Sequence, residues 1–189
     1  MKKFLAIVLT GSMALSFASC SSSESSIPES SEIETTAESE VSSTADSDFD
    51  PEFTFKTKDR DGNEYDESIF ASNKITMINF WEPWCGPCCN EIPDLETLYE
   101  TYKGQGFQIL GVYSETTMES DVDDIQKSKN VSYPFLHYAE EFDQFQTGYV
   151  PTTIFVDSKG HVITIDGEKT VVGSRSYEDW EKIVKPLLG

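Results

Sequence analysis

The chain has 189 residues and a formal net charge of −20 at pH 7. A surface this acidic repels phosphate backbones, so nucleic-acid binding is disfavoured. The roughly 140 residues after position 49 suffice for a well-buried core without covalent staples, so the four cysteines are interpreted through their chemistry.

The first 19 residues have the pattern of a bacterial lipoprotein signal peptide. A basic start at residues 2–3 precedes an apolar stretch, 4–17, which is shorter than the ~20 residues of a membrane-spanning helix. Two small residues then precede Cys20. The segment resembles a lipobox, in which this cysteine would be lipidated and become the mature N-terminus. The alternative is an ordinary cleaved signal peptide followed by an incidental cysteine.

Residues 20–48 consist almost entirely of Ser, Glu, Thr, Asp and Ala. Such a segment lacks the large apolar side chains that offset ordering entropy, and its like charges repel one another. We therefore expect a disordered, extended linker that holds a globular domain, residues 49–189, away from a membrane surface.

The domain begins with strand-like patterns and a long helix. Residues 53–57 alternate as a strand does and, with the turn signal at 61–63, predict a hairpin. Residues 74–80 form a short apolar run typical of a buried strand. Residues 86–103 show helical apolar spacing that ends near two glycines, with Pro93 expected to kink the helix.

The second half predicts two further helices, a second buried strand, a hairpin and a closing amphipathic helix. In chain order these elements are a strand at 107–113, helices at 119–129 and 140–146, strands at 152–156 and 162–165, and a helix at 177–188. Helices alternate with strands first and a hairpin follows. This order predicts an α/β fold with a mixed central sheet and helices on both faces.

The segment Trp84-Cys85-Gly86-Pro87-Cys88 lies between a predicted strand and a predicted helix. A thiolate is the nucleophile in disulfide exchange, and the free N–H groups at a helix start stabilise it. A second cysteine one turn later lies within disulfide distance. We therefore expect Cys85 to attack a substrate disulfide and Cys88 to resolve the mixed disulfide.

Two structural alternatives exist for this cysteine pair. A static disulfide closing so short a loop would stabilise the fold little. A zinc site would need two further ligands, and the only histidines, His137 and His161, lie far apart in the sequence. We expect neither a metal nor a cofactor.

Residues 79–88, N-F-W-E-P-W-C-G-P-C, with Glu91 and Pro93, resemble the thioredoxin superfamily and, more narrowly, its membrane-anchored TlpA/ResA-like branch. Residues 149–157, followed by Gly160, resemble the second signature of that family. The resemblance spans about residues 50–188. It implies a thioredoxin-like fold with a mixed central β-sheet flanked by helices on both faces.

The resemblance also implies roles for matching positions. Cys85 would be the exposed nucleophile and Cys88 the buried resolving thiol. Pro151 would be a cis-proline facing the disulfide, and the Val150 backbone would pair with a substrate peptide.

Cys85, Cys88 and Glu91 are spaced i, i+3 and i+6, so they share one helix face. A partly buried carboxylate there could accept the proton of the resolving thiol. In thioredoxins the carboxylate is an Asp on the preceding strand, where this chain has Asn79, whereas the TlpA/ResA-like branch has a helical glutamate. The alternative is a solvated surface glutamate.

Three further side chains surround the motif. Trp81 and Trp84 either pack in the core and at its rim or form an apolar surface for docking partner disulfides. Cys89 stands where the family often has Lys or Arg; it is either a bystander thiol or, at helical i+4 spacing, a partner for Cys85.

The sequence thus predicts an extracytoplasmic, lipid-anchored thiol–disulfide oxidoreductase, most plainly a reductase of oxidised extracytoplasmic proteins, cytochrome c precursors among the candidates. The family implies an integral-membrane electron donor of the CcdA/DsbD type. The alternatives are a disulfide-forming oxidase and a redox-inactive thioredoxin-like binding lipoprotein. A peroxidase would need a peroxidatic cysteine in a different loop, which the sequence does not contain.

Overall fold

The computed structural model describes residues 49–189. The predicted signal peptide, the predicted linker and Cys20 lie outside the described residues. Within 49–189, none of the helices combines the length and the apolar character that crossing a bilayer requires.

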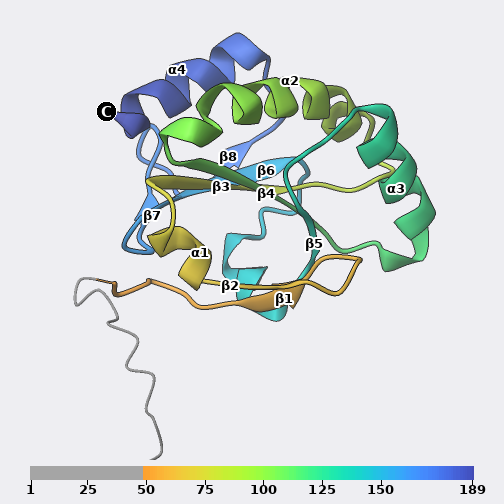
Figure 1. Cartoon of the computed structure of the whole chain (residues 1–189), viewed down its shortest axis with the longest axis horizontal. Coiled ribbons are helices and arrows are strands. Elements are labelled where there is room, and N and C mark those ends of the chain that lie inside the picture. Colours follow the sequence, from red (N-terminus) through yellow and green to blue (C-terminus); the bar gives the residue numbers. More distant parts are fainter. Residues whose placement is uncertain (1–48) are drawn as a thin grey trace, which may run out of the picture. The chain divides into compact units, whose positions relative to one another are not determined.

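A mixed six-stranded sheet forms the centre of the fold (Figure 1). Strands run in the order β5-β4-β3-β6-β7, and β8 also pairs with β6. β4 lies parallel to β3 and β5, whereas β6 lies antiparallel to β3, β7 and β8. The bounds are β3 (Ile75–Phe80), β4 (Phe107–Tyr113), β5 (Phe135–His137), β6 (Thr152–Asp157), β7 (Val162–Ile163) and β8 (Val171–Val172).

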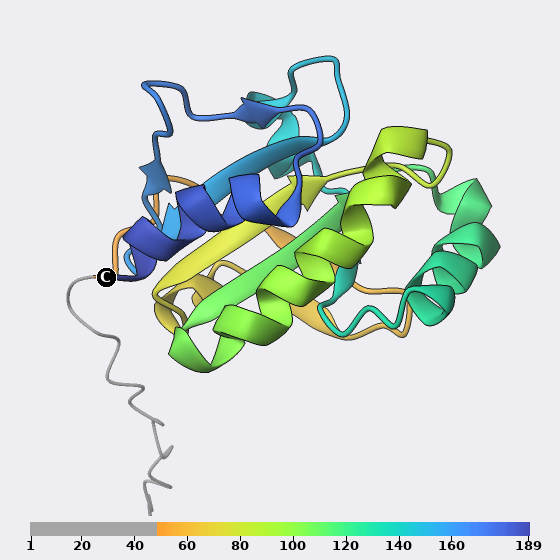
Figure 2. The same cartoon turned by 90° about the horizontal axis from the view of Figure 1, so that it is seen from above.

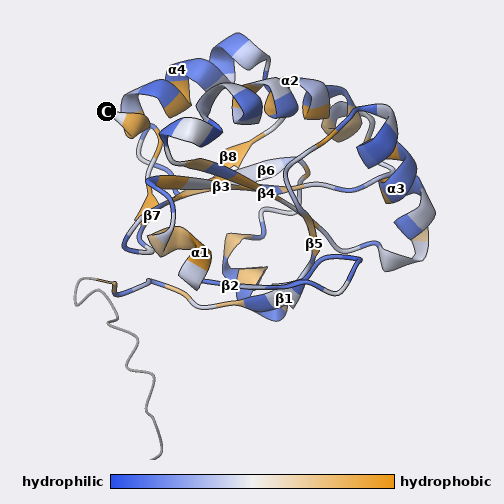
Figure 3. Cartoon of the chain, in the orientation of Figure 1, coloured by the Kyte–Doolittle hydropathy of each residue, from blue (hydrophilic) through white to orange (hydrophobic). Residues whose placement is uncertain are grey.

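Helices cover both faces of this sheet, as the sequence predicts. α2 (Gly86–Tyr102) and α4 (Tyr177–Leu188) lie side by side over one face (Figures 1 and 2). α1 (Ser68–Ala71) and the 3₁₀ helix η3 (Glu140–Phe145) cover the other face. α3 (Glu119–Ser128) flanks the β4–β5 side, and Figure 3 shows its mainly hydrophilic surface.

The alternation of side chains along the strands builds a separate core on each face. In β3, Ile75 and Met77 pack beneath α2 and α4, while Ile78 and Phe80 belong to an aromatic-rich cluster on the opposite face. Every residue of β3 is buried. A strand buried on both faces reads as a continuous apolar run, which is why 74–80 was recognisable in the sequence.

The predicted elements match the observed ones with a few corrections. β4 and α4 have the predicted bounds, and α2 begins where predicted. The N-terminal hairpin is present, but its strands are β1 (Lys56–Lys58) and β2 (Glu64–Asp66), so the strand prediction at 53–55 is wrong. Phe53 and Phe55 instead pack against Phe70 of α1, because burying their rings outweighs extending a two-stranded ribbon.

The short elements account for the remaining differences. The helix predicted at 140–146 is the 3₁₀ helix η3, and further 3₁₀ turns are η1 (Lys103–Gln105) and η2 (Thr116–Met118). The sequence did not predict α1, β5 or β8. Each has at most four residues, too few to show a hydrophobic period.

Candidate active site

The end of β3 and the start of α2 place the two cysteines. Cys85 is the N-cap of α2, and its Sγ accepts a hydrogen bond from the backbone N–H of Cys88 at 3.2 Å. Pro87 lies in the first turn, where a helix needs no donor from that residue. The unpaired N–H groups and positive end of the helix dipole therefore face the Cys85 sulfur, an arrangement that stabilises a thiolate.

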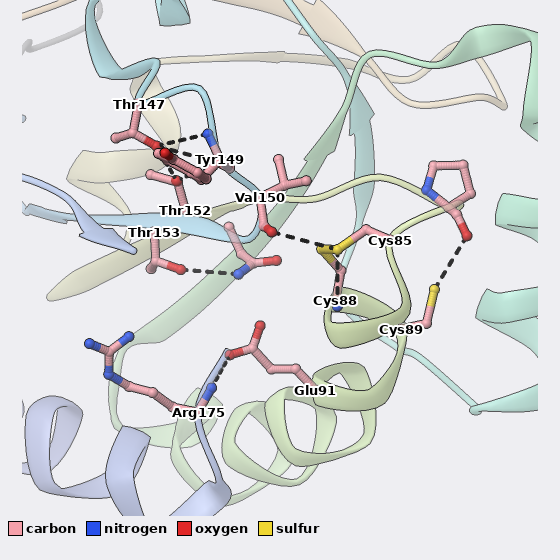
Figure 4. The surroundings of a disulfide bond; sticks show 12 residues. Cys85, Cys88, Cys89, Glu91, Thr147, Tyr149, Val150, Thr152, Thr153 and Arg175 are labelled. Atoms are coloured by element: carbon pink, nitrogen blue, oxygen red, sulfur yellow. Dashed lines mark hydrogen bonds between the residues drawn. A yellow bond between two sulfur atoms is a disulfide. The ribbon is translucent and has the colours of Figure 1, made fainter. Parts of the chain in front are cut away.

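Cys85 and Cys88 form a disulfide, with Cα atoms 5.3 Å apart. The prediction that Cys85 is exposed is wrong for this oxidised form, because only 5% of the residue is accessible, against 1% of Cys88. The loop before β6 covers it: the Cys85 sulfur lies 3.7 Å from the Val150 carbonyl oxygen (Figure 4).

Strand β6 brings this covering loop to the disulfide. β6 pairs antiparallel with β3, with Thr152 opposite Phe80, so the residues before β6 emerge beside the residues after β3. The Val150–Pro151 peptide bond is cis. The loop is fixed by the Thr152 hydroxyl, which donates to the Tyr149 carbonyl at 2.7 Å (Figure 4).

Glu91 is buried beneath the disulfide, with 3% of its surface accessible. Its Oε1 accepts hydrogen bonds from Trp180 Nε1 at 2.7 Å and from the Arg175 backbone N–H at 2.8 Å. Burial raises the pKa of Glu91, and the Arg175 and Trp180 hydrogen bonds, the neighbouring Asn79 side chain and the Arg175 charge oppose that rise. The alternative of a solvated glutamate is therefore excluded, while proton acceptance by Glu91 remains a prediction.

Asn79 occupies the strand position where thioredoxins carry an aspartate. It is buried, and its Nδ2 donates to Thr153 Oγ1 at 3.0 Å (Figure 4). This bond ties the ends of β3 and β6 together. The Asn79 amide does not ionise, so it cannot replace the aspartate of thioredoxins as a proton acceptor; Glu91 is a buried carboxylate on the cysteine face of α2.

The two tryptophans of the motif have opposite environments. Trp84 is 62% exposed beside Tyr149, which is 71% exposed. Trp81 is buried and packs on Phe135 with ring centroids 4.7 Å apart, so of its two expected places it takes the one in the core. Trp81 follows β3 directly and continues the strand's burial, whereas Trp84 projects from the turn that leads into α2.

A cavity of about 230 Å³ adjoins Trp84, Tyr149 and Val150. Its wall includes Glu82, a buried residue that sequence reasoning did not single out. The Glu82 carboxylate accepts hydrogen bonds from the backbone N–H groups of Ser114 and Glu115 at 2.9 and 3.1 Å. These bonds join the cysteine-bearing loop to the end of β4. In the sequence, the position of Glu82 among apolar residues of the motif was the feature that could have marked it as a functional candidate.

Cys89 points away from the disulfide (Figure 4). It is a free, half-buried thiol that donates to the Pro83 carbonyl oxygen at 3.4 Å, so the considered bridge to Cys85 is not formed. Burial raises the pKa of this thiol.

His137, considered as a metal ligand, pairs with Glu119, at 2.6 Å between Nε2 and Oε1. Residues 49–189 contain no cluster of three metal-ligating side chains.

Residues 49–165 match the family model described as the AhpC/TSA family. The chain belongs to the AhpC/TSA family. Relatives include proteins named thiol-disulfide oxidoreductase ResA. The one from Geobacillus kaustophilus is 27% identical over 135 residues, covering 70% of this chain and 74% of the relative. The one from Oceanobacillus iheyensis is 35% identical over 91 residues, about half of each chain, at 47%.

Solved structures agree on the fold of this AhpC/TSA family member. A thioredoxin-family thiol:disulfide interchange protein from Chlorobium tepidum aligns with a TM-score of 0.62 and 28% identity, covering 74% of this chain and 96% of that chain. StoA from Bacillus subtilis aligns with a TM-score of 0.55 and 21% identity over 69% of this chain and 96% of its own. The fold is thioredoxin-like α/β, as the sequence predicts.

Proposed function

We propose that this protein is a thiol–disulfide oxidoreductase that reduces disulfides of other proteins through Cys85 and Cys88. The observation that carries the proposal is the Cys85–Cys88 disulfide at the N-terminus of α2, covered by the Val150–Pro151 loop. Such a pair can cycle between disulfide and dithiol, because each thiolate lies within reach of the other sulfur. Relatives named thiol-disulfide oxidoreductases support the same chemistry.

Reduction of a substrate proceeds in two exchanges. The Cys85 thiolate attacks one sulfur of the substrate disulfide, forms a mixed disulfide and releases the other substrate sulfur as a thiolate. The Cys88 thiolate then attacks the Cys85 sulfur, re-forms the internal disulfide and releases the second substrate thiolate. Two electrons thus pass from the cysteine pair to the substrate, and an external dithiol reductant restores the pair.

Glu91 supplies acid–base help in the second exchange. Cys88 is 1% exposed, so its thiol cannot pass its proton directly to bulk water. Glu91 lies on the same face of α2, and its Oε2 has no hydrogen-bond partner among residues 49–189. The ionised carboxylate accepts the Cys88 proton and so generates the attacking thiolate.

The exposed surface around the pair receives the substrate. Trp84, before α2, and Tyr149, from the loop that covers Cys85, are large exposed aromatic side chains that line the same cavity. Aromatic side chains of this kind give contact area at low entropic cost and are enriched at interfaces. The backbone of Val150, in the same loop as Tyr149, pairs with an extended substrate segment.

The place of action is extracytoplasmic. The basic and apolar N-terminal pattern before Cys20 supports export and attachment through a lipid on that cysteine, and the acidic segment at 20–48 serves as a spacer. Electrons then come from an integral-membrane dithiol donor of the CcdA/DsbD type, and oxidised extracytoplasmic proteins, cytochrome c precursors among them, receive these electrons.

A thiol-exchange assay tests this proposal. The full chain, reduced and freed of reductant, is mixed with insulin as a protein disulfide, and thiols are trapped by alkylation and weighed by mass spectrometry. We expect two insulin thiols to appear for each Cys85–Cys88 disulfide formed. If Cys85 and Cys88 both remained thiols through prolonged incubation while insulin stayed oxidised, the proposal would be contradicted.

A further inference from the structure

We propose that Trp180 is a positioning residue for the redox reaction: its indole N–H holds one oxygen of Glu91 so that the other oxygen remains open to the Cys88 proton. This inference rests on the proposed function of the cysteine pair. Trp180 lies on the last helix, 89 positions beyond Glu91 in the sequence, so the inference adds a distant residue to those that act with the cysteine pair.

The contacts at Glu91 are markedly one-sided. Trp180 is fully buried on α4 and donates from Nε1 to Oε1 at 2.7 Å; the Arg175 backbone N–H donates to the same oxygen at 2.8 Å. Oε2 is buried and has no hydrogen-bond partner within the described part of the chain. One oxygen is therefore fixed by two donors, and the other keeps its capacity to take up a proton.

Burial and hydrogen bonding act in opposite directions on this carboxylate. Burial disfavours its charged form, while the Arg175 N–H, the Trp180 N–H, the Asn79 side chain and the Arg175 charge favour that form. A proton acceptor works best when its pKa lies near the operating pH. Without the indole donor, burial would keep Glu91 protonated to higher pH, and a protonated Glu91 cannot accept the Cys88 proton.

The indole itself is held from its other side. The Arg175 guanidinium carbon lies 5.2 Å from the Trp180 ring centroid, within the range of a cation–π contact. Arg175 Nη1 also donates to the carbonyl oxygens of Val172 and Gly173, at 3.3 and 2.9 Å. The turn between β8 and α4 thus packs, through Arg175, against the indole that donates to Glu91.

Few other groups near Glu91 change charge in the working pH range. The Arg175 guanidinium, from the β8–α4 turn, stays charged, and Asn79, from β3, is neutral. Tyr133, from the segment before β5, has its pKa raised well above its ordinary value by burial and stays neutral. On α2, Cys85 and Cys88 titrate only in the reduced form. A pH-dependent step therefore reports on Glu91 and these two thiols.

The test is the pH dependence of single-turnover insulin reduction by the full chain, comparing Trp180→Phe with the unchanged protein. Phenylalanine keeps an aromatic ring but removes the N–H donor. In the unchanged protein, the rate should rise with pH as Glu91 ionises. We expect the midpoint of this rise to move to higher pH by about one unit in Trp180→Phe. In a Glu91→Gln background, Trp180→Phe is expected to leave the profile unmoved, because the carboxylate through which it acts is gone.

Tyr177→Phe is the matched control. Tyr177 also lies on α4, but its hydroxyl donates to Glu181 at 3.0 Å, so its loss should not move the profile. A folded Trp180→Phe protein with an unchanged profile would overturn the role of Trp180. Failure of the unchanged protein to reduce insulin would instead overturn the proposed function.

Because Trp180 is part of the core, a second measurement does not depend on the variant folding. The indole N–H resonance of Trp180 in the unchanged full chain is followed by ¹⁵N-edited NMR as the pH is raised. We expect this resonance to move with the same midpoint as the activity limb and to stay fixed in Glu91→Gln. An indole N–H resonance whose chemical shift does not change as Glu91 ionises would contradict the inference.

Discussion

Replacing Cys88 with serine is expected to lower steady-state disulfide reduction by at least about a thousandfold and to leave substrate attached to Cys85. The variant retains the nucleophile at the N-terminus of α2, so the first exchange still occurs. It lacks the thiol that attacks the resulting mixed disulfide. Non-reducing electrophoresis with mass spectrometry should therefore show a covalent complex that dithiothreitol releases.

Cys89 provides the control for this experiment. Its thiol donates to the Pro83 carbonyl oxygen and points away from the pair, so Cys89→Ser should reduce insulin as the unchanged chain does. The double variant Cys88→Ser/Cys89→Ser should trap as much complex as Cys88→Ser alone. Trapping in the double variant only would mean that Cys89 resolves the intermediate, contrary to the roles assigned here.

Glu91→Gln is expected to slow the resolving step by about a hundredfold or more, the range typical of a lost acid–base group. Glutamine keeps the size of the side chain and an oxygen for the Trp180 and Arg175 donors, but it cannot accept a proton. The first exchange, which depends on Cys85, should change far less. Rapid-quench alkylation separates the two steps.

The pH dependence gives this prediction a definite sign. Burial raises the pKa of Glu91, so the carboxylate is protonated at low pH and ionises only above its ordinary range. Resolution by the unchanged chain should therefore accelerate as the pH rises through that raised pKa. Glu91→Gln should lack this limb and show only the ionisation of its thiols. If the resolving step had the same pH dependence in both proteins, Glu91 would have no acid–base role in it.

The long or fully buried elements could be predicted from the sequence because their patterns are local. β3 and β4 are continuous apolar runs, and α4 has a clear amphipathic period with Ser176 as its N-cap. The strand–CxxC–helix order alone indicated the redox pair. Three-residue β5 and two-residue β8 exist because neighbouring strands pair with them, which no local pattern records.

The environment of the candidate site depended on contacts between distant residues. Glu91 could be placed on the cysteine face of α2, but its donors come from α4 and the turn before it. The cover over Cys85 arises because β6 lies against β3, which reverses the predicted exposure. Trp81 and Trp84, three residues apart, could not be assigned to core and surface without the path of the loop.

The reduction potential of the Cys85–Cys88 pair tests the central claim most directly. The full chain is equilibrated in glutathione and dithiothreitol redox buffers, and the dithiol fraction is measured by alkylation and mass spectrometry. A reductase requires a potential near or below about −250 mV, in the range of thioredoxin. A value above about −150 mV would contradict the account and make the protein a disulfide-forming oxidant. The absence of any reversible two-electron couple would leave only a binding role for this fold.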